Sequence, residues 1–130
     1  TNNDTYLAYL WTEISGFSRF GFYTGNASTD GPFVWCGFRP KFIMWKFITS
    51  TGYFDIVDTS RSTFNPDSGT ALQSGTNIAE GNLGGNYGLD ILSNGFKLRG
   101  VNSEMNQTAG GGKYVFAAFA ENPFKYSLAR

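Results

Sequence analysis

The sequence predicts an all-β domain, an antiparallel β-sandwich of jelly-roll-like type. Short apolar runs are separated by clusters of Gly, Pro, Asn, Asp and Ser, which is typical of strands and turns. No stretch combines a helix cap with a sustained 3.6-residue period. Antiparallel pairing is favoured because parallel strands need long, usually helical, crossovers.

The apolar runs define the expected strands in order. They span residues 5–12, 17–24, 32–36, 41–49, 53–58, 88–92, 95–99 and 113–121. The best-defined hairpin has Asn94-Gly95 at its turn, a pair that suits the positive φ angles of a type I′ turn. In its second arm Phe96 and Leu98 alternate with Lys97 and Arg99, so one face of that arm is expected to meet solvent.

Strands 41–49 and 113–121 differ from the others because both of their faces are mainly apolar. One face can fill the core of the sandwich, and the other needs a second partner. A loop of the same chain is one possible cover, and a second subunit is the other. We favour a subunit interface and a homo-oligomer, because monomers seldom expose large apolar patches.

The composition of the chain describes one neutral domain. Ten Lys and Arg residues balance ten Asp and Glu residues, which argues against nucleic acid or an anionic membrane as the main partner. No stretch reaches the length of a membrane span. Histidine is absent, and Cys36 is the only cysteine, so a disulfide within the chain and a thiolate metal cluster are both excluded. We expect Cys36 to be a small buried residue, and we expect no cofactor.

A polar, glycine-rich segment, residues 59–87, separates the two halves of the predicted strand pattern. Loops this long in compact domains are usually functional. Sugar rings stack on aromatic faces, and asparagine side chains hydrogen-bond to hydroxyl groups, so these two residue types are candidate receptor contacts. The candidates in and beside the segment are Tyr53, Asn77, Asn82, Asn86 and Tyr87. Trp45, in the middle of a strand, is expected to serve packing.

Charged side chains at strand ends give two further predictions. Asp58 and Arg61 are three residues apart, and we expect a structural ion pair that fixes the start of the long loop. Glu13 and Glu121 close two similar strands and would meet if those strands paired, as the two carboxylates of a glycosidase require. No other feature of the sequence supports catalysis, so we expect no enzyme.

The two ends of the chain repeat each other. Residues 5–13 align with residues 113–121, and each copy is a strand that ends in glutamate and leads into a turn. Such self-similarity marks tandem units. We therefore expect residues 1–16 to be the closing strand of a preceding repeat, and residues 17–130 to form a single sandwich module.

Three ordered motifs carry a resemblance to a known family. They lie at residues 20–40, from Phe-Gly-Phe-Tyr-Thr-Gly-Asn to Gly-Phe-Arg-Pro, at residues 92–99 (Leu-Ser-Asn-Gly-Phe-Lys-Leu-Arg), and at residues 120–126 (Ala-Glu-Asn-Pro-Phe-Lys-Tyr). Together they resemble a domain of unknown function that is repeated near the C-termini of bacteriophage tail-fibre-like proteins. The Asp58-x-x-Arg61 pair is also similar to that family's pattern.

This resemblance implies a virion tail protein in a homotrimeric fibre, in contact with other tail proteins and with a possible role in host attachment. The resemblance implies no catalytic residues. The leading hypothesis is a module that presents loops to a host-surface glycan. A purely structural virion component is the first alternative, and a polysaccharide-degrading enzyme is the second.

Overall fold

The fold is that of a computed structural model, which describes residues 4–66, 70–82, 86–107 and 112–123. Within these residues it contains nine strands and no helix. The strands are β1 (Ser18–Thr24), β2 (Phe33–Trp35), β3 (Pro40–Phe47), β4 (Phe54–Asp58), β5 (Thr70–Ser74), β6 (Gly81–Asn82), β7 (Leu89–Leu92), β8 (Gly95–Leu98) and β9 (Lys113–Ala120). The described residues accordingly include no helix that is long and apolar enough to cross a membrane.

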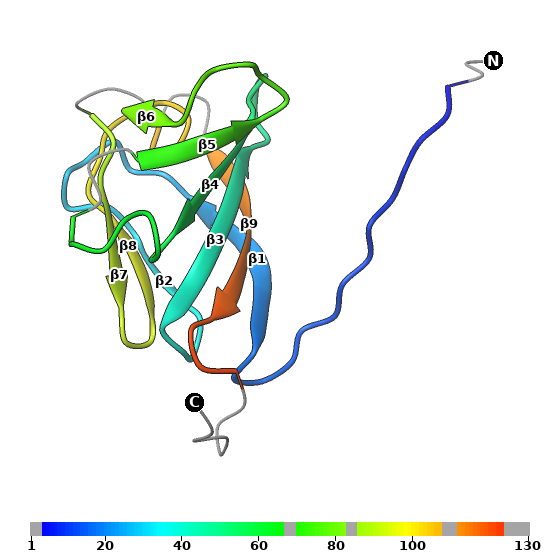
Figure 1. The fold of residues 1–130 in the computed structure, drawn as a ribbon. Helices are drawn as coiled ribbons and strands as arrows, with labels where there is room; N and C mark the ends of the chain where they lie inside the picture. The colour runs from blue at the N-terminus through cyan, green and yellow to red at the C-terminus, as the bar shows by residue number, and fades with distance from the viewer. Residues whose placement is uncertain (1–3, 67–69, 83–85, 108–111, 124–130) are drawn as a thin grey trace.

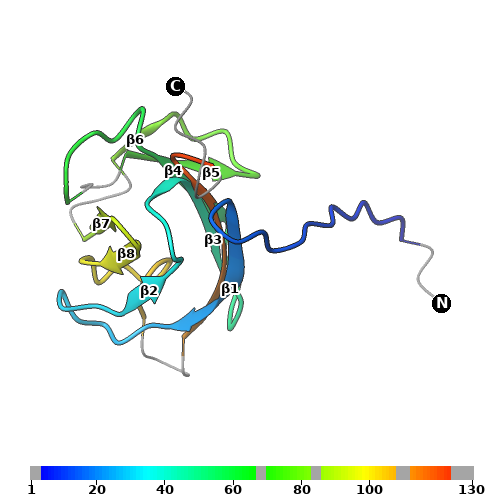
Figure 2. The same cartoon turned by 90° about the horizontal axis from the view of Figure 1, so that it is seen from below.

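The strands form two antiparallel sheets that face each other (Figure 1). The larger sheet has the order β1-β9-β3-β4-β5-β6, and the smaller has the order β2-β8-β7. Seen from below, the larger sheet curves around the smaller one (Figure 2). The predicted all-β, antiparallel, sandwich-like fold is therefore confirmed.

The strand predictions were right for seven segments and wrong for one. β1 to β4 and β7 to β9 lie within or overlap their predicted ranges. Residues 5–12 form no strand, because they pair with no other described segment. The segment 59–87 contains β5 and β6, which the sequence analysis treated as loop. These two short strands have few β-branched or aromatic residues, so they carry no strong strand signal.

The β7–β8 hairpin is confirmed, but its turn differs from the prediction. Leu92 pairs with Gly95, so the two turn residues are Ser93 and Asn94. Neither Asn94 nor Gly95 has a positive φ angle. Gly95 is needed for close packing instead, since a Cβ atom there would lie 2.1 Å from the carbonyl oxygen of Val34 in β2.

The core lies between the two sheets and is rich in stacked aromatic rings. Tyr114 of β9 lies between Tyr23 and Phe47, with ring centroids 4.9 Å away on each side. Trp45 is 1% exposed, which confirms that it serves packing. Phe96 of the smaller sheet meets Phe116 edge to face, so the aromatic contacts join both sheets.

A loop of residues 99–107 closes one end of the core. Its backbone carbonyl groups accept hydrogen bonds from three buried aromatic side chains. The pairs are Tyr23 to Met105 at 2.9 Å, Trp45 to Glu104 at 3.1 Å and Tyr114 to Ser103 at 2.6 Å. The side chain of Asn106 is fully buried and joins its own loop to the β1–β2 loop. It accepts from the amide of Asn26 and donates to the carbonyl groups of Ser28 and Gly100, each at 2.8 Å. These bonds hold the loop over the core.

The outer face of the larger sheet is apolar as well. In β3, Ile43 and Trp45 point into the core, while Phe42 and Met44 alternate with them and are half-buried. The same alternation places Val115 and Phe119 of β9 on the outer face. The prediction of two apolar faces on these strands is confirmed.

Candidate functional site

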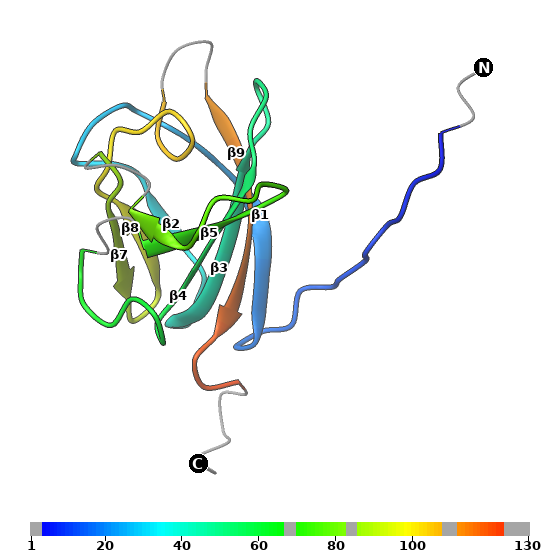
Figure 3. The same cartoon turned by 45° about the horizontal axis from the view of Figure 1, so that its top comes forward.

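The predicted receptor contacts lie on several loops. Tyr53 is 44% exposed and directly precedes β4, and Asn77 is exposed in the turn that follows β5. Phe54 pairs with Ser74, so these two candidates lie at the same end of the larger sheet (Figure 3). Asn82 lies in β6, where its backbone pairs with Thr70. No described contact joins the side chains of Tyr53 and Asn77 into one site.

The other two candidates lie between β6 and β7 and differ in exposure. Asn86 has an exposed side chain, and its carbonyl group accepts from the amides of Val101 and Asn102. Tyr87 is only 7% exposed, and its hydroxyl donates to Glu104 at 2.9 Å. The ring of Tyr87 is part of the core, so it offers no open face to a sugar.

The predicted Asp58–Arg61 ion pair is present. The guanidinium Nε of Arg61 lies 2.5 Å from a carboxylate oxygen of Asp58. The other oxygen of Asp58 accepts from the backbone amides of Ser60 and Arg61. Burial raises the pKa of Asp58, but these hydrogen bonds outweigh it and hold the pKa below its usual value. The pair fixes the start of the long loop, as expected.

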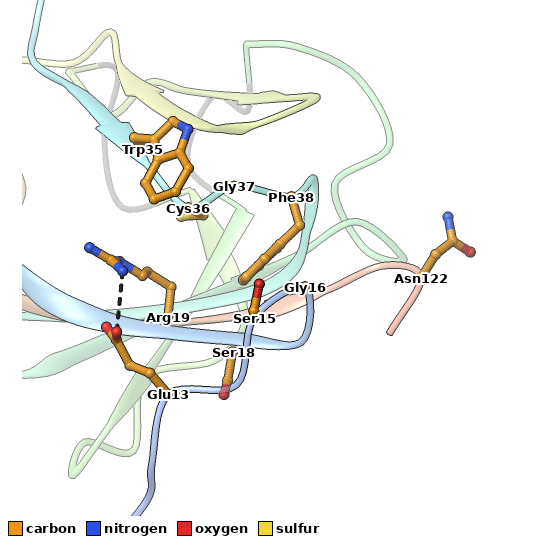
Figure 4. A pocket seen from close by; sticks show the side chains of 10 residues that line it. All are labelled: Glu13, Ser15, Gly16, Ser18, Arg19, Trp35, Cys36, Gly37, Phe38 and Asn122. Carbon is orange, nitrogen blue, oxygen red and sulfur yellow. Dashed lines mark hydrogen bonds and ion pairs between the residues drawn. The ribbon is translucent and has the colours of Figure 1, made fainter. Parts of the chain in front are cut away.

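A surface pocket lies elsewhere, where the start of β1 approaches the end of β2 (Figure 4). Its volume is about 460 Å³. It is lined by Glu13, Ser15, Gly16, Ser18, Arg19, Trp35, Cys36, Gly37, Phe38 and Asn122. These residues come from the ends of strands and from the turns beside them, the usual place for binding groups on a rigid β scaffold.

Trp35 is the aromatic side of this pocket. β2 is an edge strand in which Val34 points into the core, so Trp35, the next residue, points outward and is 55% exposed. The guanidinium group of Arg19 lies 5.3 Å from the centroid of the indole ring. The arginine and the backbone of Gly37 therefore each lie against part of the ring, and Trp35 stays 55% exposed.

Glu13 and Arg19 supply the charged side of the pocket. Their side chains lie 3.2 Å apart and are 45% and 41% exposed. Because exposed ion pairs are held weakly, both groups can exchange this contact for a ligand hydroxyl. Ser15 and Asn122 add neutral polar groups at the rim (Figure 4). An open indole face beside charged and neutral hydrogen-bonding groups is the chemistry that binds a sugar ring.

Cys36 lies in the wall of the pocket but is itself buried, as predicted. It is 4% exposed, and burial raises the pKa of its thiol to about 12, despite an opposing effect of Arg19. A thiol with so high a pKa stays protonated and is a poor nucleophile. Its role is packing.

A cluster of buried and half-buried polar side chains lies between β4, β5 and the 99–107 loop. The side-chain amide of Gln73 donates to Asp55 at 3.0 Å and to Glu104 at 2.7 Å. The second carboxyl oxygen of Asp55 is buried and has no hydrogen-bond partner among the described residues. Burial raises the pKa of Asp55 to about 7, with the nearby Glu104 adding to the rise and the bond from Gln73 opposing it. Asp55 therefore retains its proton in the folded protein under mildly acidic conditions.

The two carboxylates of the enzyme alternative are not brought together by strand pairing. Glu13 bonds to Arg19, and Glu121 bonds to Arg39, each at 3.2 Å. β9 pairs with β1 and β3 and not with residues 5–12. The pairing on which that alternative depended does not form. Among the described residues no three His, Cys, Asp or Glu side chains group to hold a metal ion.

The sequence analysis did not assign Trp35 to a site. Its short apolar run was predicted only to be a strand, at residues 32–36. The available signal was that a three-residue edge strand buries only its central side chain, which leaves its last residue exposed. The turn that follows, with Gly37 at a φ of 80°, brings the chain back beside the indole ring.

Fold and site together define a class: an all-β domain of two antiparallel sheets that carries a shallow aromatic and charged pocket on its surface. A family model described as a domain of unknown function (DUF7483) matches residues 1–123, and the chain belongs to that family. No curated protein and no solved structure matches it. The match includes both the N-terminal residues and the sheets, and the division into 1–16 and 17–130 stays a prediction.

Proposed function

We propose that this domain is an adhesion module of a bacteriophage tail fibre, and that it binds a host-surface glycan. The observation that carries the proposal is the half-exposed indole of Trp35 beside the Glu13–Arg19 pair. The resemblance of three ordered motifs to tail-fibre-like repeats supports the viral setting. In this proposal the sandwich is jelly-roll-like, and the fibre is a homotrimer in the virion that contacts other tail proteins.

Binding would need no cofactor and no covalent chemistry. One face of a sugar ring stacks on Trp35, and its hydroxyl groups bond to Glu13, Arg19 and the polar rim of the pocket. A shallow pocket of this kind gives weak affinity. Repetition along a trimeric fibre would multiply weak contacts through their effective concentration.

We predict that Trp35→Ala abolishes adsorption of the protein to host cells and to surface glycans on an array. Removal of the indole takes away the stacking surface, and such aromatic contacts contribute about 1 kcal/mol or more each, which repetition amplifies. The substitution removes an exposed side chain, so thermal unfolding should change little. Adsorption and thermal unfolding are measured on the same preparations.

Tyr53→Ala is the matched control, because Tyr53 is also exposed but lies outside the pocket. If Tyr53→Ala and not Trp35→Ala removes adsorption, binding occurs at the loops beside β4 and β5, and the Trp35 pocket is not the site. If the natural protein adsorbs to no host cell and to no glycan, the adhesion proposal is wrong and the purely structural alternative remains.

A further inference from the structure

The N-terminal residues form an apolar arm that leaves the body of the domain. Trp11 and Glu13 still contact β1, whereas residues 4–10 extend away from the sheets (Figures 1 and 3). Their large apolar side chains are open to solvent, with Leu10 92% and Tyr6 83% exposed. Leu7, Tyr9 and Trp11 are 79%, 70% and 59% exposed. Such a concentration of exposed apolar groups marks an interaction segment.

The outer face of the larger sheet offers a surface of the same kind. Phe22 of β1 is 72% exposed there, and Phe54 and Leu72 are 36% and 37% exposed. A small apolar hollow on this face, about 160 Å³, is lined by Trp11, Phe20, Met44, Phe54, Val115, Phe116 and Ala117. The arm and the outer face of the larger sheet are therefore both apolar.

Trp11 shows where the arm makes contact. Its ring stacks on Phe20 of β1 with centroids 6.1 Å apart and an interplanar angle of 12°. Trp11 is thus the arm residue that reaches the outer face of its own sheet. The residues before it, from Tyr6 to Leu10, continue away from the domain (Figure 2). The larger sheet of the same chain therefore does not cover the residues from Tyr6 to Leu10.

We infer that residues 4–10 of one copy dock on the outer face of the larger sheet of a second copy. An extended arm of this length reaches about 23 Å. The distance from β1 to β4 across the sheet is three strand spacings, about 14 Å. Docking would cover the two tyrosine rings of this segment, Tyr6 and Tyr9, which can bury about 150–250 Å² each, together with the side chains of Leu7 and Leu10.

The sequence pattern of the arm also supports a second copy of the chain as the docking partner. Residues 5–13 repeat the pattern of β9, and β9 pairs with β1 in antiparallel register from Ser18–Phe119 to Thr24–Lys113. Within the described residues β1 forms one edge of the larger sheet, and its only bridge on that side joins Ile14 to Ser18. The arm of a second copy, which has the pattern of β9, can therefore approach at this open edge and continue over the outer face beside it.

Sedimentation velocity tests the inference with single substitutions in the full chain. Phe22→Asp and Leu10→Asp place a charge on the face and on the arm, and both should convert an associated natural protein to a monomer at micromolar concentration. Phe64→Asp is the control, because Phe64 is 84% exposed in the loop after β4, away from both surfaces. A monomeric natural protein, or equal loss of association in Phe64→Asp, overturns the inference.

Thiol cross-linking identifies the occupant. Cys36 is buried, so cysteines placed by Leu10→Cys and Phe22→Cys react selectively with a bis-maleimide linker. Differently tagged single variants, when mixed, should give a cross-linked pair that carries both tags. If the doubly substituted chain gives only a cross-link within one chain, the arm folds onto its own sheet and the inference is wrong. Neither assay contains glycan, so their outcome is independent of the proposed adhesion.

Discussion

Asn106→Asp is expected to lower the free energy of unfolding by about 3–5 kcal/mol at neutral pH, the usual cost of an unpaired buried charge. The new side chain keeps the acceptor for the amide of Asn26 but loses both donors to Ser28 and Gly100. It places a carboxylate against two carbonyl oxygens in a fully buried position. Urea denaturation at pH 7 measures the change.

Asn102→Asp is the matched control for this experiment. Among the described contacts the side chain of Asn102 only accepts, from the amide of Glu104 at 2.8 Å, and a carboxylate accepts equally well. We expect the stability to stay within about 1 kcal/mol of the natural protein. If both variants lose the same stability, a general sensitivity of the 99–107 loop to negative charge explains the result, and the two donated bonds do not.

Asp55→Asn is expected to remove a large part of the pH dependence of stability. The raised pKa of Asp55, about 7, means that the folded state binds a proton more tightly than the unfolded state, where the value is 3.8. Stability from this group is complete below about pH 4 and is lost as pH rises to about 7. A shift of this size corresponds to a loss of up to about 4 kcal/mol, which asparagine would not show. Urea denaturation from pH 4 to pH 8 measures the two curves.

Asp58→Asn provides a control of opposite sign. The pKa of Asp58 is lowered, so its contribution is present above the usual pKa of aspartate and is lost as pH falls. Removal of this carboxylate should therefore reduce the stability lost in acid, whereas Asp55→Asn should reduce the stability lost toward neutral pH. Parallel curves for Asp55→Asn and the natural protein would show that Asp55 ionises normally in the folded state.

The sequence was sufficient for most of the fold because strand signals are local. Alternation in β3 and β9 identified both the strands and their second apolar face. The prediction at residues 5–12 failed although the pattern there resembles β9, because a segment becomes a strand only by pairing with a neighbour, and residues 5–12 pair with no described segment. β5 and β6 were missed for the converse reason: they form by pairing with a neighbouring edge, and their residues have little strand preference.

The candidate site was less predictable because it depends on which side chains the fold leaves exposed. Tyr87 and Asn86 are adjacent and both looked like receptor contacts, yet Tyr87 packs in the core and Asn86 faces solvent. The pocket joins Glu13, Arg19 and Trp35, which are brought together only by the approach of β1 to β2. The Asp58–Arg61 pair was predictable because both partners lie within one turn of chain.

The position of β9 in the larger sheet has a consequence for biosynthesis. β9 lies between β1 and β3, so residues as distant as Ser18 and Phe119 are direct partners. A chain emerging from the ribosome cannot complete this sheet until its last strand has been made. Non-local pairing of this kind slows folding, and the unpaired edges of β1 and β3 remain open to other chains in the meantime. The larger sheet can therefore be completed only after residues 113–120 have been made.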